Sequence, residues 1–173
     1  IWNSEIKQKF TVFVLSGDVD HAVSVKTVLA QDGFDTYILP DQEALILRIQ
    51  EAAPHLVVFS KSGLNTPLQE FVQEIINLNS EIKFLPICAA NDVADYVKYR
   101  EYNFVGVCLD GEGMLSRLSW MVDEAMKGIY LHYQNEQVFA AMEETKKQIE
   151  AVQSEADMVR LRAEKSAGIS LSE

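Results

Sequence analysis

Residues 11–39 read TVFVLSGDVDHAVSVKTVLAQDGFDTYIL, a segment in which a strand, a helix and a second strand follow one another. The first five residues are mostly β-branched or aromatic and predict a buried strand, which ends at a polar turn, residues 16–18. Apolar residues then recur at helical spacing over residues 21–31, and Gly33 is a typical helix stop. Residues 34–39 predict a second strand, closed by Pro40. This order predicts two parallel strands joined by a helix.

The same alternation continues to about residue 128. Continuous apolar runs predict strands at residues 56–59, 84–88 and 104–109. Helical patterns occupy residues 43–52, with Asp41 as N-cap, then 67–78, 92–102 and the chain from Met114 onward. Pro86 lacks the N–H that a sheet ladder needs, so its strand is expected to lie near an edge or to be locally irregular. Five such units predict an α/β fold: a doubly wound, five-stranded parallel sheet of the flavodoxin-like kind.

The composition is that of an acidic globular protein. The 173 residues include 26 acidic and 15 basic side chains, so the formal net charge is -11, and 48% of the residues are hydrophobic. The charge disfavours direct binding to nucleic acid or to an anionic membrane, and no apolar run approaches the ~20 residues of a membrane span. Cys88 and Cys108 lie in apolar runs without metal-ligand spacing, so we expect buried free thiols, no metal, and a cytoplasmic protein.

A different repeat begins at about residue 130. Apolar residues recur there at alternating steps of three and four, which predicts the seam of a coiled coil, and charged residues fill most other positions. The seam is out of phase with the earlier stripe at Leu115, Leu118 and Val122, so it needs a partner other than the sheet. We therefore expect a homodimer through this helix. The seam residues are Met142, Thr145, Ile149, Val152, Ala156, Val159 and Ala163.

Several local patterns are similar to those of the receiver domain of bacterial two-component response regulators, over roughly residues 10–128. Val14-Leu-Ser-Gly-Asp-Val-Asp20 stands where that family has an acidic pair after the first strand. Gln31-Asp-Gly-Phe34 looks like the family's exit from its first helix, and Pro54-His-Leu-Val-Val-Phe-Ser60 resembles Pro-Asp-Leu-Val-Leu-Leu-Asp. The resemblance implies a signalling module that would normally accept phosphate on an aspartate beside Mg²⁺.

The catalytic residues of that family are replaced at nearly every position. Mg²⁺ prefers several oxygen ligands, and one carboxylate without a phosphate acceptor is a poor site. A serine hydroxyl without a neighbouring base is a weak nucleophile. We therefore expect no phosphotransfer, no metal and no cofactor. The replaced positions are the phosphoacceptor, Ser60; the acidic pair, Ser16 and Gly17 or, with a shift of one residue, Gly17 and Asp18; and the switch positions, Ala89 and either Cys108 or Leu109.

Residues 92–104 contain a cluster of aromatic side chains. Tyr96, Tyr99 and Tyr102 are spaced by three, which places them on one helical face, and Phe104 follows them. In receivers the corresponding face is the usual docking and dimerisation surface. The cluster is therefore expected to be either an edge of the core or a contact surface for a protein partner.

The histidines have simple explanations. His21 lies near Asp18 and Asp20, which could suggest a metal cluster, but one of these aspartates as a helix N-cap is the simpler interpretation. His55 precedes an apolar strand and is expected at a surface edge. His132 is expected to be solvated or at a dimer contact.

These observations predict a non-enzymatic pseudo-receiver that acts as an interaction and dimerisation module in a signalling pathway. The expected parts are a lead-in at 1–10, a receiver-like domain at 11–128, a coiled-coil linker at 129–167, and a truncated tail at 168–173 before a missing output domain. One alternative is a sensor that binds a small molecule or nucleotide in the vacated pocket lined by Ser16, Gly17, Ser60 and Ala89, near Lys61. An enzyme on the same scaffold is a further alternative, although no nucleophile–base pair is visible.

Overall fold

The computed structural model describes the backbone of residues 1–172 and the side chains of residues 1–167. The chain divides into two units, one of residues 1–128 and a helical one that begins at Ile129. The tail predicted at 168–173 falls on residues whose side chains lie outside this description, as does the backbone of residue 173.

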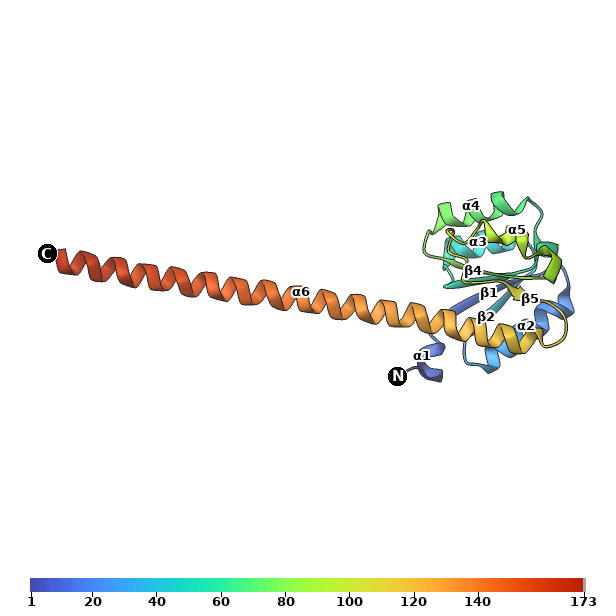
Figure 1. Ribbon diagram of the computed structural model, residues 1–173, viewed down its shortest axis with the longest axis horizontal. Coiled ribbons are helices and arrows are strands. Elements are labelled where there is room, and N and C mark those ends of the chain that lie inside the picture. Colours follow the sequence, from blue (N-terminus) through green and yellow to red (C-terminus); the bar gives the residue numbers. More distant parts are fainter. Residues whose placement is uncertain (173) are drawn as a thin grey trace. The chain divides into compact units, whose positions relative to one another are not determined.

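A five-stranded parallel sheet forms the centre of the first unit (Figure 1). Its strands are β1 (Thr11–Leu15), β2 (Asp35–Leu39), β3 (Leu56–Phe59), β4 (Lys83–Cys88) and β5 (Cys108–Leu109). The strand order is β2-β1-β3-β4-β5, and every neighbouring pair is parallel. The predicted doubly wound sheet is therefore confirmed. In this order the direction of winding reverses between β1 and β3.

Helices cover both faces of the sheet. They are α1 (Ser4–Lys7), α2 (Val19–Gln31), α3 (Gln42–Glu51), α4 (Leu68–Leu78), α5 (Ala94–Val97) and α6 (Met114–Ser172). The view in Figure 1 shows α2 and the start of α6 on one face, with α3, α4 and α5 on the other. Asp18 and Asp41 accept backbone N–H groups at the starts of α2 and α3, which confirms both as N-caps.

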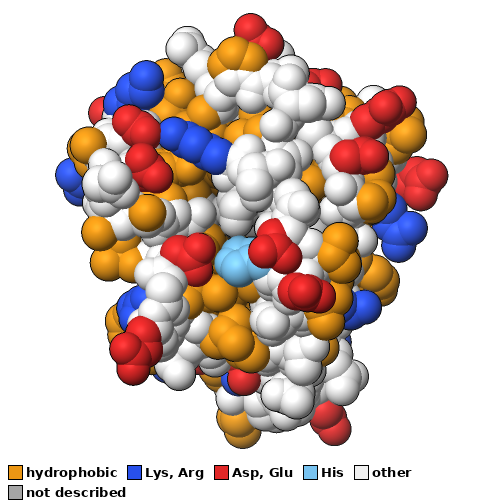
Figure 2. Space-filling model, turned by 90° about the vertical axis from the view of Figure 1, so that its right-hand side faces the viewer, with side chains coloured by type: hydrophobic (Ala, Val, Ile, Leu, Met, Phe, Trp, Pro, Cys, Tyr) orange, Lys and Arg blue, Asp and Glu red, His pale blue; other side chains and the backbone are white. Residues whose placement is uncertain are grey.

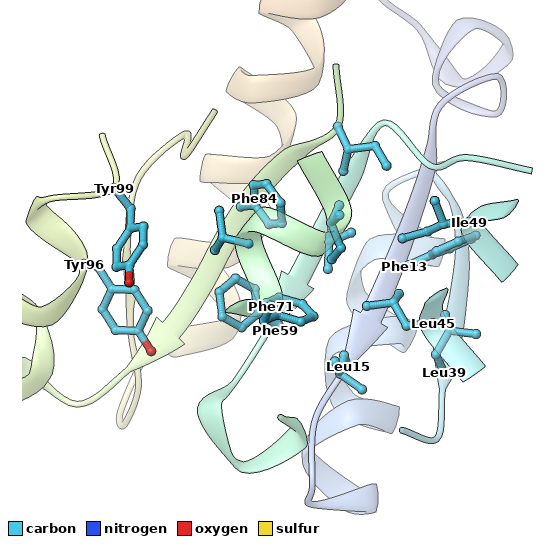
Figure 3. Close-up of a cluster of buried hydrophobic side chains, with 14 of the residues drawn as sticks. Phe13, Leu15, Leu39, Leu45, Ile49, Phe59, Phe71, Phe84, Tyr96 and Tyr99 are labelled. Atoms are coloured by element: carbon cyan, nitrogen blue, oxygen red, sulfur yellow. The ribbon is translucent and has the colours of Figure 1, made fainter. Parts of the chain in front are cut away.

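One large hydrophobic cluster lies between the sheet and the layer of α3, α4 and α5 (Figure 3). Phe59 of β3 is at its centre, with its ring 5.1 Å from that of Phe71 on α4 and 6.4 Å from that of Phe84 on β4. All three side chains are at most 1% exposed. Burying each contributes roughly 1.5–3 kcal/mol before conformational entropy is counted. This cluster fixes the strands whose ends form the candidate site.

Pro86 shows how a proline fits inside this sheet. The Phe84 N–H donates to Asn103, and the Phe84 carbonyl accepts from Val105, so residues 84, 86 and 88 turn their backbone polar groups toward β5. Pairing with β5 resumes only at Ile87, which leaves a gap in that ladder opposite Pro86. The missing N–H is therefore not needed, and the predicted local irregularity is confirmed.

The helix predicted at 92–102 is wrong over most of its length. Only α5 is α-helical; a short 3₁₀ turn, η2 (Ala90–Asp92), precedes it. The chain from Tyr96 to Tyr102 continues in turns, because the Tyr99 N–H donates to Tyr96 and the Tyr102 N–H donates to Tyr99. Such three-residue steps bring the three tyrosines to one side, but as tight turns rather than as an α-helix.

The strand predicted at 104–109 is also shorter than expected. Asn103 has a φ of 68°, and Gly106 has a φ of 155°, so the backbone departs from strand geometry on both sides of Val105. The positive φ favours glycine at position 106, whereas the only near contact of an added Cβ would be the flexible end of Met121, at 2.8 Å. Regular pairing with β4 is therefore limited to Cys108 and Leu109.

The N-terminal lead-in is folded onto the first unit. The Trp2 indole N–H donates to Asp123 on α6 at 3.1 Å, and the Lys7 ammonium lies 2.8 Å from the same carboxylate. The Trp2 ring also contacts Phe10 and Phe34. Residues 1–10 thus join the start of α6 to the β1–β2 side of the domain.

Candidate functional site

The predicted site residues meet at the carboxyl ends of the strands. Ser16 follows β1, Ser60 follows β3, Ala89 follows β4 and Leu109 ends β5. The Ser60 N–H donates to the Leu15 carbonyl at 3.0 Å, which places the first two turns side by side. Figure 2 shows a face of the first unit on which a histidine lies near the centre with carboxylates on both sides.

The polar groups of the turn between β1 and α2 form hydrogen bonds with one another. Asp18 accepts the His21 N–H at 3.2 Å, and the Ser16 hydroxyl accepts the Asp18 N–H at 3.2 Å. The same hydroxyl lies 3.2 Å from His21 Nδ1. The only carboxylate at the predicted acidic pair is therefore the N-cap of α2, as the simpler interpretation expected.

The loop after β3 packs directly on this turn. It forms a 3₁₀ turn, η1 (Lys61–Gly63), and the Ser62 hydroxyl accepts the Gly17 N–H at 3.1 Å. A Cβ on Gly17 would overlap the Ser62 carbonyl, and one on Gly63 would lie 2.9 Å from the Leu15 side chain. The space that an acidic side chain would need at position 17 is thus filled by the backbone of η1.

Two cations near the site are already engaged. The Lys61 ammonium lies 2.8 Å from Asp95 and 5.2 Å from the centre of the Tyr96 ring. Its hydrogen bond holds the pKa of the Asp95 carboxyl below its ordinary value. Arg117 donates to the Leu109 and Glu112 carbonyls, both at 2.7 Å, and so fastens the loop between β5 and α6. Both cations thus have hydrogen-bond partners within the first unit.

The side chains at the ends of β4 and β5 are buried or apolar and none of them is a reactive group. Cys88 and Cys108 are free and buried, which confirms the expected buried thiols. Burial raises the pKa of both thiols, so both remain protonated near neutral pH. Ala89 is the N-cap residue of η2 and offers no hydroxyl.

An open hollow of about 580 Å³ lies beside the turn, between the starts of α2 and α6. Asp18, Asp20, His21 and Ser24 line one side of it, and residues 111–116 contribute most of the other. His21 Nε2 is 3.9 Å from an Asp110 oxygen. Over residues 1–167, no group of three or more His, Cys, Asp or Glu side chains could hold a metal ion.

Sequence reasoning missed three of these residues. Ser62, Arg117 and Asp110 make contacts with residues that are distant in the sequence and that meet only when the loops fold. Their local sequence contains no pattern that predicts these contacts. His55 was expected at a surface edge. It is instead half-buried against Phe10, with its Nδ1 accepting the Thr11 N–H at 3.0 Å.

Of the two expectations for the aromatic cluster, an edge of the core is the one that Tyr96 and Tyr99 meet, and the contact surface is wrong for these two residues. Tyr96 and Tyr99 are 1% and 5% exposed and belong to the hydrophobic cluster around Phe59, as Figure 3 shows. Their rings fill the space beside Phe104, which is also partly buried. Of the four aromatic residues, only Tyr102 presents a large exposed area, 46%. Tyr96 and Tyr99 are thus core residues and cannot dock a partner.

The seam lies in the second unit and is exposed. Met142, Ile149, Val152 and Val159 are between 54% and 65% exposed. Thr145 donates its hydroxyl to the Ala141 carbonyl at 2.9 Å, so its polar group is satisfied within the helix. Ala156 and Ala163 continue the same spacing and are also exposed. No helix in the described part of the chain is long and apolar enough to cross a membrane.

Comparison with known proteins adds to this geometry. No family model and no curated protein matches the chain. Among solved structures, NtrX from Brucella abortus superposes with a TM-score of 0.66 at 18% identity, covering 74% of this chain and 29% of NtrX. A response regulator receiver domain from Clostridium thermocellum gives 0.62 at 11% identity, covering 70% of this chain and 98% of that domain. CheY4, a chemotaxis response regulator of Vibrio cholerae, gives 0.56 at 12% identity, covering 67% and 98%.

The chain spans less than a third of the length of NtrX but almost the whole of the two shorter proteins. Their common part is the five-stranded parallel sheet with its helices. The first unit of this chain therefore has the fold of a response-regulator receiver domain.

Proposed function

We propose that the chain is a pseudo-receiver, a signalling module that does not accept phosphate at Ser60 and that dimerises through its C-terminal helix. Residues 11–128 form the interaction module in this proposal, and residues 129–167 form a linker that passes the geometry of the dimer to an output domain. A protein in the same cytoplasmic pathway is its partner.

The observation that carries this proposal is the contact between η1 and the β1–α2 turn. Gly17 occupies a position of the acidic pair and has no space for a side chain, because the Ser62 carbonyl lies against it. Asp18 caps α2, so its carboxylate is directed to a backbone N–H. A divalent cation at this place would have no pair of carboxylates to hold it.

The nearby groups do not supply another route to phosphotransfer. Lys61 is paired with Asp95 at 2.8 Å. Ser60 would need a base to become a useful nucleophile, whereas His21 lies 3.2 Å from the Ser16 hydroxyl and Asp95 lies 2.8 Å from Lys61. The alternative of a sensor with a ligand in the vacated pocket is less favoured, because the backbone of η1 lies directly against Gly17, one of the residues expected to line that pocket.

The test is incubation of the full chain with Mg²⁺ and acetyl phosphate, and separately with Mg²⁺ and beryllium fluoride. We expect no phosphoryl adduct by intact mass and no Mg²⁺-dependent change in the fluorescence of Trp2 or Trp120. A receiver domain that retains the aspartate and the acidic pair serves as the positive control.

A Ser60→Asp variant sharpens this test. It restores the acceptor but not the acidic pair, and we expect it to remain unmodified. A stable adduct on the parent chain would overturn the proposal. An adduct only on the variant would show that the acceptor alone had been lost.

A further inference from the structure

The exposed seam continues toward the start of the second unit. The alternation of three- and four-residue steps can be extended from Met142 toward the N-terminus. It then includes Val138, Asn135 and Leu131. Val138 is 58% exposed and Leu131 is 47% exposed, so both share the character of the later seam residues. The seam therefore runs from Leu131 to Ala163, with a single polar amide, Asn135, in its first part.

We propose that two copies of this helix form a parallel, in-register, two-stranded coiled coil in which Asn135 and the Glu155–Arg160 pair set the register. This inference rests on the proposed dimer and adds its orientation and alignment. The occupant of the exposed face is a second copy of the chain.

Asn135 favours one alignment over all others. In a parallel, in-register pair the two Asn135 side chains face each other across the seam, where each amide can both donate and accept. A shift of one heptad would place each Asn135 against an apolar residue such as Met142 and leave a buried amide without a partner. The neighbouring Gln134 and Gln137 already donate to Tyr130 and Tyr133 on their own helix.

The charges beside the seam agree with this alignment. Glu155 and Arg160 occupy the flanking positions that meet between chains in a parallel coil, residue 155 of one chain beside residue 160 of the other. Two opposite-charge pairs therefore form in each dimer. Within one chain, Arg160 lies 3.2 Å from Asp157 and both side chains are exposed, so the contact can exchange for one with a second helix.

The remaining flanking pairs are compatible with the same arrangement. Gln134 meets Phe139, Lys146 meets Ala141, Gln148 meets Gln153 and the charged Arg162 meets Ala167, so no like charges are brought together.

An antiparallel pair in which the same residues, 131–163, overlap would be less stable, because it makes less favourable contacts at each of these positions. It would set Asn135 opposite Val159 and would bring Lys146 beside Lys146 of the second copy. It would also separate Glu155 from Arg160. The antiparallel form thus buries an unpartnered amide, adds a repulsion and loses two attractions.

Cysteine cross-linking of the full chain tests the orientation. Met142→Cys places two thiols face to face in the proposed dimer and should form a disulfide-linked dimer rapidly under mild oxidation. Glu150→Cys, on the outer side of the helix, controls for random collision and should link at least about tenfold more slowly. The parent chain should not link, because Cys88 and Cys108 are buried. An antiparallel dimer would instead link Met142→Cys to Val152→Cys in a mixture of the two variants.

Charge reversal tests the register. Glu155→Arg should weaken association about tenfold, since two attractions become repulsions, and Arg160→Glu should act similarly. The combined variant should recover parental association, whereas Glu150→Arg should change it little. Failure of the combined variant to recover, or a Met142–Val152 cross-link, would overturn this inference and leave the dimer intact. A parent chain that stays monomeric at tens of micromolar would overturn the proposed dimer itself.

Discussion

The two units of the chain differ in how far their apolar residues are buried. In residues 1–128 the strands bury nearly all of theirs, and Val12, Leu56, Val57 and Leu85 have no exposed area. In the second unit the seam residues from Val138 to Val159 are more than half exposed. The difference teaches that the first unit has its own core, whereas the helix, in the proposed dimer, would gain its stability from association and so depend on concentration.

The largest effect is expected from removing the apolar character of the exposed seam in the second unit. Changing Ile149 and Val152 together to Asp puts four carboxylates into the seam of each dimer, where they would be desolvated and close to one another. We expect association to weaken by at least about 100-fold, seen by sedimentation velocity, while near-ultraviolet circular dichroism of the first unit stays unchanged.

The matched control carries the same charges outside the seam. Changing Ala151 and Ser154 to Asp should leave the dimer largely intact, because both positions lie on the outer side of the predicted coil. If the seam variant remains dimeric, the coiled-coil assignment fails.

The second expected effect lies in the core of the first unit. Tyr96→Ala should lower the free energy of unfolding by about 3–5 kcal/mol, because it empties a space surrounded by Phe59, Phe104 and Tyr99. Urea denaturation of the full chain measures this loss. Association through the helix should be unaffected, which separates the two units experimentally.

Tyr96→Phe is the matched variant. The Tyr96 hydroxyl is buried without a hydrogen-bond partner, and burial raises its pKa. Removing it should be neutral or stabilising. Equal losses from the Phe and Ala variants would contradict this assignment and point to a polar role for the hydroxyl.

The two central strands beside the point of reversal could be predicted closely from the sequence because they are buried on both faces, unlike the edge strand predicted at 104–109. Residues 11–15 and 56–59 are β1 and β3 to the residue, since continuous apolar runs have no other stable place in a sheet of this kind. The helix at 92–102 failed because the spacing of its tyrosines fits three-residue turns as well as an α-helix, and no cap or length distinguished the two.

The candidate site could be predicted in position but not in detail. The strand ends identified Ser16, Ser60 and Ala89, because parallel strands end at one edge. The contact of Ser62 with Gly17 depends on how one loop lies on another, which no periodicity encodes. The same limit applied to Tyr96, whose burial depends on the turn that carries it.

The third effect tests how tightly the loops of the site fit. Gly17→Ala should destabilise the first unit by about 1–3 kcal/mol, because its methyl group would press on the Ser62 carbonyl. Gly128→Ala is the control, since nothing lies near that position in α6, and it should stabilise the helix by up to about 1 kcal/mol. Thermal unfolding of both variants measures the difference. A Gly17→Ala variant as stable as the parent would show that η1 can move aside, and would reopen the space beside Ser60.

The smallest effect compares one histidine from each unit. Burial lowers the pKa of His55, whose neutral ring accepts the Thr11 N–H through Nδ1. The unfolded chain, where the pKa is about 6.5, therefore binds this proton more readily than the folded one. The stability that His55 contributes is complete above that value and is lost as the pH falls below it.

Urea midpoints of the parent at pH 7.5 and pH 5.5 should accordingly differ, and His55→Gln, which keeps an acceptor but does not titrate, should reduce the difference. His132→Gln should leave it unchanged, because His132 is exposed and pairs only with Glu136 on the surface of α6. If both variants keep the parental pH dependence, the contact between His55 and Thr11 is not what links protonation to folding. A reduction confined to His55→Gln would place this acid sensitivity in the first unit.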